Sequence, residues 1–219
     1  MTLGLDAEIN RRITASWCAY WKQKDIMKGN FPTNFKRKIF NTCVLPVLIY
    51  GAETWSLSNK QEERLRVTQR SMERSMLGKS RRDRIRNEWI REKTGVMDVI
   101  EQVKRRKWKW AGHVARMSDD RWTIRISEWY PREGKRNRGR QLLRWRDELE
   151  KIAGKNWMRE AKDRKNWKML EEAYILQWIK KADDNPMRHS SPRLTLNRRT
   201  DTRYYLVRLT TRTTPTRVF

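Results

Sequence analysis

The residues best suited to binding a ligand lie between Lys104 and Arg146, where lysine and arginine alternate with tryptophan. The segment reads KRRKWKWAGHVARMSDDRWTIRISEWYPREGKRNRGRQLLRWR. Guanidinium and ammonium groups neutralise phosphates, and indole rings can stack on bases or fill a protein core. The segment therefore predicts a polyanionic partner, and nucleic acid is the first hypothesis.

Two groups of candidate binding residues follow from this segment. The candidates for phosphate contact are Lys104, Arg105, Arg106, Lys107, Lys135, Arg136, Arg138 and Arg140. The candidates for stacking on bases are Trp108 and Trp122, whereas predicted buried helix faces carry Trp110, Trp145, Trp167 and Trp178. No module for reading base edges is visible, so we expect nonspecific binding to RNA, DNA or both.

Charge runs have a simpler interpretation as solvated helix faces, and this competes with phosphate contact. The chain contains 52 Lys and Arg residues against 26 Asp and Glu residues, which gives a formal net charge of +26. Such an excess opposes compaction through self-repulsion unless a polyanion screens it. The charge of the whole chain therefore favours phosphate contact by residues 104–107 and 135–140.

Two pairs of adjacent aspartates are the only motifs that resemble a catalytic metal site. Two-metal phosphoryl transfer needs carboxylates held close together, in polymerases beside an aromatic residue on a hairpin. Asp119–Asp120 fits a helix boundary, and Asp183–Asp184 lacks flanking apolar strands. The cysteines and histidines share no metal-ligand spacing. We therefore predict no catalysis by this chain alone, no metal site and no cofactor.

Composition restricts the compartment. The longest apolar run, residues 43–50, is too short to cross a bilayer, and the N-terminal residues do not resemble a secretory signal. Two cysteines, Cys18 and Cys43, provide no disulfide framework, and both lie on apolar faces of expected helices. We expect buried cysteines in a protein of the nucleus or cytoplasm that is neither secreted nor bound to a membrane.

Apolar residues recur at helical spacing along most of the chain, and no strand-like alternation is sustained. The predicted fold class is mainly α. The expected helices cover residues 6–28, 33–46, 58–78, 82–92, 98–114, 142–154 and 156–178. Helix 82–92 is expected to bury Ile85 and Trp89, and Asp98 with Glu101 has the spacing of a capping box. From about Asp184 the periodicity ends, which predicts a disordered tail.

Several segments in colinear order carry a family resemblance: 40–55 (FNTCVLPVLIYGAETW), 77–94 (LGKSRRDRIRNEWIREKT), 106–117 (RKWKWAGHVARM) and 134–147 (GKRNRGRQLLRWRD). They resemble the region that follows the polymerase palm in non-LTR retrotransposon reverse transcriptases of animals. Residues 3–180 share this resemblance, which is greatest to endonuclease–reverse transcriptase polyproteins of insects and vertebrates.

The resemblance implies a fragment that lacks the endonuclease and the metal-binding palm. Residues 1–80 would form a post-palm and thumb-like helical region, residues 81–182 a basic Trp-rich helical region, and residues 183–219 the disordered tail. By family analogy, the thumb holds the template–primer duplex and the basic region holds RNA or target DNA. The parent polymerase would use magnesium, whereas this fragment would not. The sequence leaves the oligomeric state undetermined.

Two alternatives stay open at this point. The chain could belong to a longer, active RNA-directed DNA polymerase whose gene start is misplaced, in which case upstream genomic sequence would encode an aromatic-Ala-Asp-Asp box. It could also be a translated relic with no selected function, whose core is too small to fold stably. A cooperative thermal melt followed by circular dichroism would argue against the relic.

Overall fold

The computed structural model describes residues 4–118, 122–128 and 144–183. For residue 128 and residues 177–183 it describes the backbone but not the side chains. These residues form helices and turns, and they include no strand, so the predicted mainly α class is confirmed for this part of the chain. None of the helices in the described ranges has the length and apolar content to span a bilayer. The expected tail after Asp184 lies outside these ranges.

Helices near the N-terminus follow the predicted pattern with one interruption. The helix expected over residues 6–28 is α1 (Leu5–Lys22) and α2 (Lys24–Lys28), separated at Gln23. Next, α3 (Thr33–Ile39) leads through a π-helical turn (Phe40–Val44) into α4 (Leu45–Leu48). Proline cannot donate a backbone hydrogen bond, and the wide turn lies directly before Pro46. The proline therefore alters the helix without ending it.

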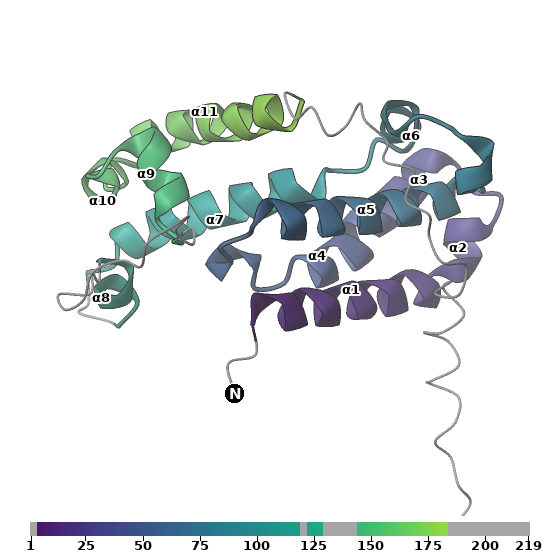
Figure 1. Ribbon diagram of the computed structural model, residues 1–219, viewed down its shortest axis with the longest axis horizontal. Coiled ribbons are helices and arrows are strands. Elements are labelled where there is room, and N and C mark those ends of the chain that lie inside the picture. The colour runs from purple at the N-terminus through teal and green to yellow at the C-terminus, as the bar shows by residue number, and fades with distance from the viewer. Residues whose placement is uncertain (1–3, 119–121, 129–143, 184–219) are drawn as a thin grey trace, which may run out of the picture. The chain divides into compact units, whose positions relative to one another are not determined.

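The long helix α5 (Asn59–Met76) begins and ends where its sequence predicts. The Ser58 hydroxyl accepts a hydrogen bond from the Gln61 backbone, and the Gln61 side chain accepts one from the Ser58 backbone, which completes a capping box. Gly78 follows the helix with a φ of +66°, a conformation that glycine adopts without strain. In Figure 1, α5 lies against both α1 and α7 (Val99–Ala115).

The helix predicted over residues 82–92 is wrong in its bounds and in its buried face. Arg81–Asp83 form a 3-10 turn, and α6 covers Asn87–Thr94. It buries Ile90, whereas Trp89 is exposed. The cause is local, because the turn has its own cap and Arg84 follows it with a φ of +48°. A residue in that conformation ends the helical path, so α6 starts later than expected.

Four helices follow α7 in the described residues. They are α8 (Trp122–Glu128), α9 (Asp147–Ala153), α10 (Trp157–Glu160) and α11 (Arg164–Asp183). Gly154, with a φ of +77°, ends α9 as predicted. The single helix expected from Asn156 is two, because the Asp163 carboxylate accepts hydrogen bonds from the backbones of Lys165 and Asn166 and so begins α11.

Helix α7 contributes to two hydrophobic cores. The Asp98 cap is confirmed, since its carboxylate accepts from the backbones of Ile100 at 2.9 Å and Glu101 at 3.1 Å. The reciprocal half of the expected capping box is absent, because the Glu101 carboxylate accepts from Arg105 instead. The first half of α7 packs into an N-terminal core that includes Ile9, Tyr20, Phe40, Val44, Leu48, Leu65, Met72, Val99, Ile100 and Val103. The second half packs into a C-terminal core of Trp108, Ala111, Ala115, Leu149, Trp157, Ala161, Trp167, Tyr174 and Ile175.

The described residues up to 181 belong to one compact unit, the first of two in the chain. The expected boundary at residue 80 therefore falls inside the first unit, where α5 packs on α7 across it. The separate roles expected for residues 1–80 and 81–182 stay a prediction.

The expectation of buried cysteines is wrong for both residues. Cys18 and Cys43 are exposed. On α1 the buried side chains include Ser16 and Tyr20. Cys18 lies two residues from each, and two residues correspond to about 200° of rotation around a helix. The Cys18 side chain therefore points away from the face that α1 buries.

Gly112 lets α11 approach α7 closely. A Cβ atom at this position would lie 2.5 Å from Nε1 of Trp167, well inside van der Waals contact. The indole of Trp167 is held there, because it donates to the Trp108 carbonyl at 3.0 Å while the Trp108 indole donates to the Trp167 carbonyl at 2.9 Å. The Trp167 ring would have to move, against the hydrogen bond that holds it, to accept a larger residue at position 112.

Gly112→Ala will therefore destabilise the protein, although alanine is ordinarily the better helix former. We expect a loss of about 1–3 kcal/mol, which is typical of overpacking and exceeds the roughly 0.5–1 kcal/mol gained in helix propensity. Urea denaturation measures the difference. Gly4→Ala is the control, because a Cβ atom there meets nothing within 4 Å. Equal stabilities for the two variants would contradict the close packing of Trp167 on α7.

Candidate nucleic-acid interface

Lys104 and Lys107, two of the predicted phosphate contacts, lie in the protein interior. Both residues are 1% exposed. Lys104 Nζ lies 2.7 Å from Glu148 Oε1 and 3.0 Å from Glu62 Oε1. Lys107 Nζ lies 2.7 Å from Glu148 Oε2 and donates to the Trp55 carbonyl at 3.2 Å. The prediction that these lysines contact nucleic acid is therefore wrong for this fold.

The four charged side chains of this buried cluster, Glu62, Lys104, Lys107 and Glu148, join α5, α7 and α9 where the two cores meet. Burial lowers the pKa of Lys107, because a charged ammonium is disfavoured away from water, although Glu148 opposes that effect. Burial alone would raise the pKa of Glu148, but the two lysines lower it by more. The arrangement therefore stabilises an ionised carboxylate between two ammonium groups inside the protein.

Arg105 and Arg106 differ in how far their charges are already neutralised. The Arg105 guanidinium lies 2.9 Å from Glu172, 3.0 Å from Glu101 and 3.4 Å from Glu171. The hydrogen bond to Glu172 is the largest of the effects that raise the pKa of Arg105. Arg106 is half-buried, donates to a backbone carbonyl at 3.4 Å and forms no ion pair with a described residue. Arg106 is therefore the better phosphate candidate.

Trp108, predicted to stack on bases, is fully buried. Its ring lies 3.9 Å from that of Trp167 with an interplanar angle of 9°, and 4.7 Å from that of Tyr174. Both faces of the indole are covered by protein in this arrangement, and its exposed fraction is 0%. The stacking prediction is therefore wrong for Trp108, because the aromatic partners are Trp167 and Tyr174 of α11.

The tryptophans assigned to the core divide among three outcomes. Trp167 is buried, and Trp145 is half-buried and donates from its indole to the Glu53 carbonyl at 2.7 Å. Trp110 is also only half-buried, so the buried face of α7 is rotated slightly from the one expected. The side chain of Trp178 lies outside the described part.

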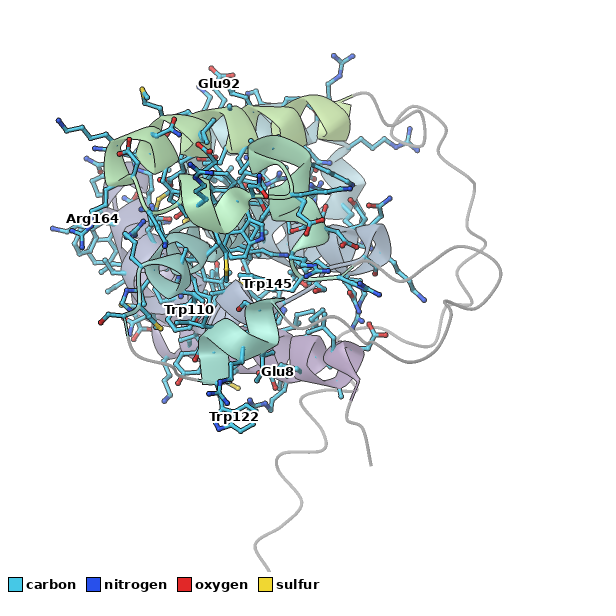
Figure 2. All side chains as sticks on the ribbon, turned by 90° about the vertical axis from the view of Figure 1, so that its left-hand side faces the viewer. Glu8, Glu92, Trp110, Trp122, Trp145 and Arg164 are labelled. Atoms are coloured by element: carbon cyan, nitrogen blue, oxygen red, sulfur yellow. The ribbon has the colours of Figure 1, made fainter. Side chains whose placement is uncertain are left out.

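Trp122 is the stacking candidate that the structure leaves accessible. It is 74% exposed, and Figure 2 shows it projecting from the first turn of α8. The Arg125 guanidinium lies 5.6 Å from the centre of its ring. The predicted phosphate contacts Lys135, Arg136, Arg138 and Arg140 lie outside the described residues, so their role stays a prediction.

A basic pocket lies among helices that precede and follow residues 135–140 in the sequence. This C-terminal pocket has a volume of about 670 Å³. It is lined by Ala115, Met117, Ile124, Ser127, Arg146, Glu150, Lys155, Asn156, Trp157, Met158, Arg159 and Lys162. Its one acidic lining residue, Glu150, is paired with Arg146 at 3.3 Å. Cations and apolar atoms together suit a ligand that carries both phosphates and bases.

Three cations of the C-terminal pocket were missed by the sequence reasoning. Lys155, Arg159 and Lys162 are exposed, and none forms an ion pair with a residue in the described ranges. A signal for them existed, because they recur four and three residues apart and so share one side of a helix-like segment. This signal is weaker than that of the denser charge runs at 104–107 and 135–140.

Within residues 4–118, 122–128 and 144–183, no three His, Cys, Asp or Glu side chains gather as a metal site would require. Asp119–Asp120 and Asp184 lie outside that part, and the side chain of Asp183 is not described. The expected absence of catalysis and of a cofactor therefore stays a prediction.

Comparison with known proteins gives one informative relative. The chain is 38% identical over 173 residues to a putative uncharacterized transposon-derived protein of Caenorhabditis elegans. The match covers 73% of this chain and 62% of the relative, so the chain spans less than two thirds of that protein. No family model matches the chain, and no solved structure matches it. The similarity supports a transposable-element origin.

Proposed function

We propose that this chain is the thumb and C-terminal part of a non-LTR retrotransposon reverse transcriptase, and that it binds the nucleic-acid backbone without catalysing a reaction itself. The observation that carries this proposal is the C-terminal pocket. It presents Lys155, Arg159 and Lys162 without carboxylate partners in the described part, beside helix α8 with its exposed Trp122.

The predicted phosphate contacts Lys135, Arg136, Arg138 and Arg140 fall, in the sequence, between two helices of the C-terminal pocket. Residues 131–140 follow α8 and precede α9. Helix α8 lines the C-terminal pocket through Ile124 and Ser127, and α9 lines it through Glu150, with Arg146 directly before that helix. Because these cations follow one pocket helix and precede another in the chain, we infer that they contact the same strand as the pocket.

Two further observations support a retroelement origin for this binding function. The relative from Caenorhabditis elegans is named as transposon-derived. The resemblance to reverse transcriptases assigns the catalytic aspartates to a palm that precedes the resembling region. The role left for this chain is to hold RNA or DNA, and template RNA, primer or target DNA are the ligands that the parent enzyme would offer.

Charge reversal in the C-terminal pocket tests the proposal. Arg159→Glu and Lys162→Glu will each weaken binding of a labelled single-stranded RNA by about threefold to tenfold. Each will also reduce the salt slope of log Kobs by about 0.7, because one phosphate contact and its released counterion are lost. Fluorescence anisotropy at several salt concentrations gives both quantities.

Lys60→Glu is the matched control, since Lys60 is exposed at the start of α5 and does not line the C-terminal pocket. We expect it to weaken binding by less than about threefold, through net charge alone. Equal losses for Lys60→Glu and the two pocket variants would remove the C-terminal pocket from the interface. Absence of binding by the unaltered chain at about 50 mM salt would contradict the proposed function itself.

A further inference from the structure

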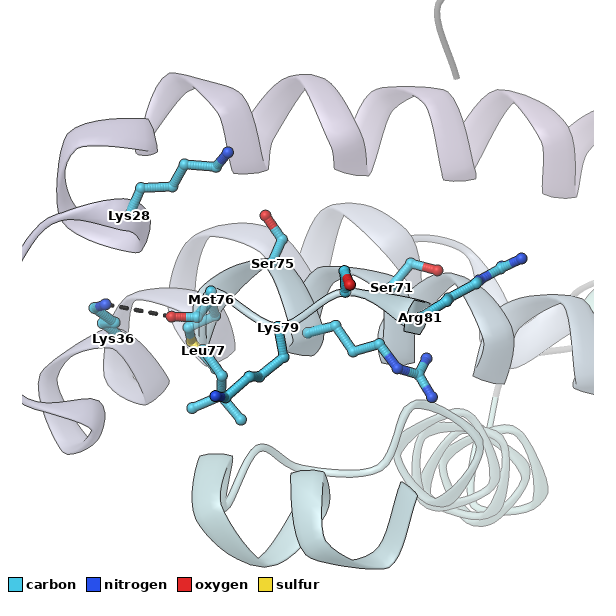
Figure 3. Close-up of a pocket in the computed structure, with 11 residues that line it drawn as sticks. Lys28, Lys36, Ser71, Ser75, Met76, Leu77, Lys79 and Arg81 are labelled. Carbon is cyan, nitrogen blue, oxygen red and sulfur yellow. Dashed lines mark hydrogen bonds between the residues drawn. The ribbon is translucent and has the colours of Figure 1, made fainter. Parts of the chain in front are cut away.

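A second basic pocket lies at the C-terminal end of α5, and none of its lining residues was singled out for binding by the sequence. This α5-end pocket has a volume of about 590 Å³. Its lining residues are Lys28, Lys36, Ser71, Arg74, Ser75, Met76, Leu77, Gly78, Lys79, Ser80 and Arg81. Figure 3 shows that they come from α2, α3, the last turns of α5 and the segment that follows it. Among these described residues five are cationic and none is acidic.

Some cations of the α5-end pocket make contacts within the protein, and others do not. Lys36 Nζ donates to the Met76 carbonyl at 3.3 Å, which satisfies one carbonyl at the end of α5. The Arg74 guanidinium donates to the Asn87 side chain. Lys79 and Arg81 are exposed, and neither forms an ion pair with any residue that the structure describes. Two positive charges are therefore available to a ligand.

Electrostatic crowding indicates the charge that the pocket would accept. Burial lowers the pKa of Arg74, and the neighbouring Arg81 lowers it further, because a second cation disfavours the charged guanidinium. The buried Glu73 carboxylate opposes this effect only as a lesser contribution. An anion placed between Arg74 and Arg81 would relieve their repulsion.

An exposed aromatic residue adjoins the pocket through Lys28. The Lys28 ammonium lies 5.2 Å from the centre of the Trp21 ring, and Trp21 is 40% exposed. A single strand offers phosphates to cations and unpaired bases to exposed rings, and the two contacts commonly occur together. A free inorganic anion would use only the cations.

We propose that the α5-end pocket binds a backbone phosphate of a single-stranded nucleic acid, and this inference rests on the proposed function. Lys79 and Arg81 contact the phosphate directly, and Arg74 supports it from the floor of the site. The α5-end pocket would then be a contact for nucleic acid additional to the C-terminal pocket. An anionic lipid headgroup is the rival ligand, because exposed rings beside cations also suit a membrane surface.

The test compares Lys79→Glu with Lys60→Glu in the full chain. Both lysines are exposed, and they lie just beyond the end and at the start of the same helix, so the two variants change net charge equally. We expect Lys79→Glu, and independently Arg81→Glu, to weaken binding of a labelled single-stranded RNA by about threefold to tenfold. Each should lower the salt slope by about 0.7, whereas Lys60→Glu leaves that slope unchanged. Thermal melts followed by circular dichroism show whether each variant is folded. Where a glutamate variant does not fold, the glutamine variant at the same position, Lys79→Gln or Arg81→Gln, is measured instead.

The outcomes separate this inference from the proposed function. If the unaltered chain binds RNA and Lys79→Glu changes the affinity no more than Lys60→Glu does, the inference about the α5-end pocket is contradicted. The proposed function then stands. If the unaltered chain does not bind RNA at low salt, both fall. Cosedimentation with vesicles containing phosphatidylserine covers the rival ligand. Vesicle binding that Lys79→Glu abolishes, with RNA binding unchanged, would assign the pocket to lipid and contradict the inference.

Discussion

Replacing Glu148 with glutamine will lower the free energy of unfolding by about 3–5 kcal/mol, the effect expected when one partner of a buried ion pair is removed. Glu148 is 1% exposed and its carboxylate lies 2.7 Å from both Lys104 and Lys107. Glutamine keeps the size of the side chain but leaves two ammonium groups in the interior with much less compensation. Urea denaturation followed by tryptophan fluorescence measures the loss.

Glu150→Gln is the control for this prediction. Glu150 lies on the same helix and pairs with Arg146 at 3.3 Å, but both side chains are partly exposed. Pairs of that kind contribute about 0–1 kcal/mol, since water solvates the charges when the pair is broken. If Glu148→Gln costs no more than Glu150→Gln, the buried cluster does not hold the two cores together.

The pH dependence of the Glu148 effect has a definite sign. The two lysines lower the pKa of this carboxyl in the folded state below its ordinary value of 4.5, despite the opposing effect of burial. The stability that ionised Glu148 contributes is therefore fully present above about pH 4.5 and is lost as the pH falls through the folded-state pKa. The difference in stability between the unaltered chain and Glu148→Gln should shrink over that acidic range.

Truncating Trp108 to alanine will cost about 3–5 kcal/mol, within the range found for buried aromatic residues. The substitution removes the ring that stacks between Trp167 and Tyr174, and it also removes the donor to the Trp167 carbonyl. The backbone carbonyl of residue 108 still accepts from Trp167, but the cavity leaves that indole without its stacking partner. A thermal melt should show a markedly lower Tm.

Trp122→Ala is the matched control, because Trp122 is mostly exposed and lies on the short helix α8. Its loss should change stability by no more than about 0.5 kcal/mol, as for surface substitutions generally. Comparable losses for the two tryptophans would contradict the burial of Trp108. The pair also separates the two roles of tryptophan in this chain, since only Trp122→Ala should weaken RNA binding without weakening the fold.

Local signals predicted much of the secondary structure. Asp98 caps α7, Ser58 begins α5, and Gly78 and Gly154 follow helix ends, because caps and left-handed glycines are determined by a few neighbouring residues. The start of the helix that contains Trp89 was predicted too early, again because of a local cap. A short turn with its own cap competed with the helix and displaced its start.

The candidate site was less predictable because its residues depend on distant partners. Lys107 interrupts the apolar stripe of α7, and that position was a sign of burial rather than of ligand contact. Its partner Glu148 lies 41 residues away, and the sequence does not state that pairing. Trp108 likewise depends on Trp167, 59 residues away. Residue type alone indicated which side chains could contact phosphates, whereas the fold shows which of the described cations reach the surface.

Salt-dependent binding of single-stranded RNA by the unaltered chain tests the proposed function most directly. Fluorescence anisotropy between about 50 and 200 mM salt gives log Kobs against log salt concentration. Contact with several phosphates predicts a straight line of negative slope, about 0.7 for each phosphate neutralised. No measurable binding at the lowest salt, or an affinity that salt does not change, would contradict the proposal that this basic helical chain holds a nucleic-acid backbone.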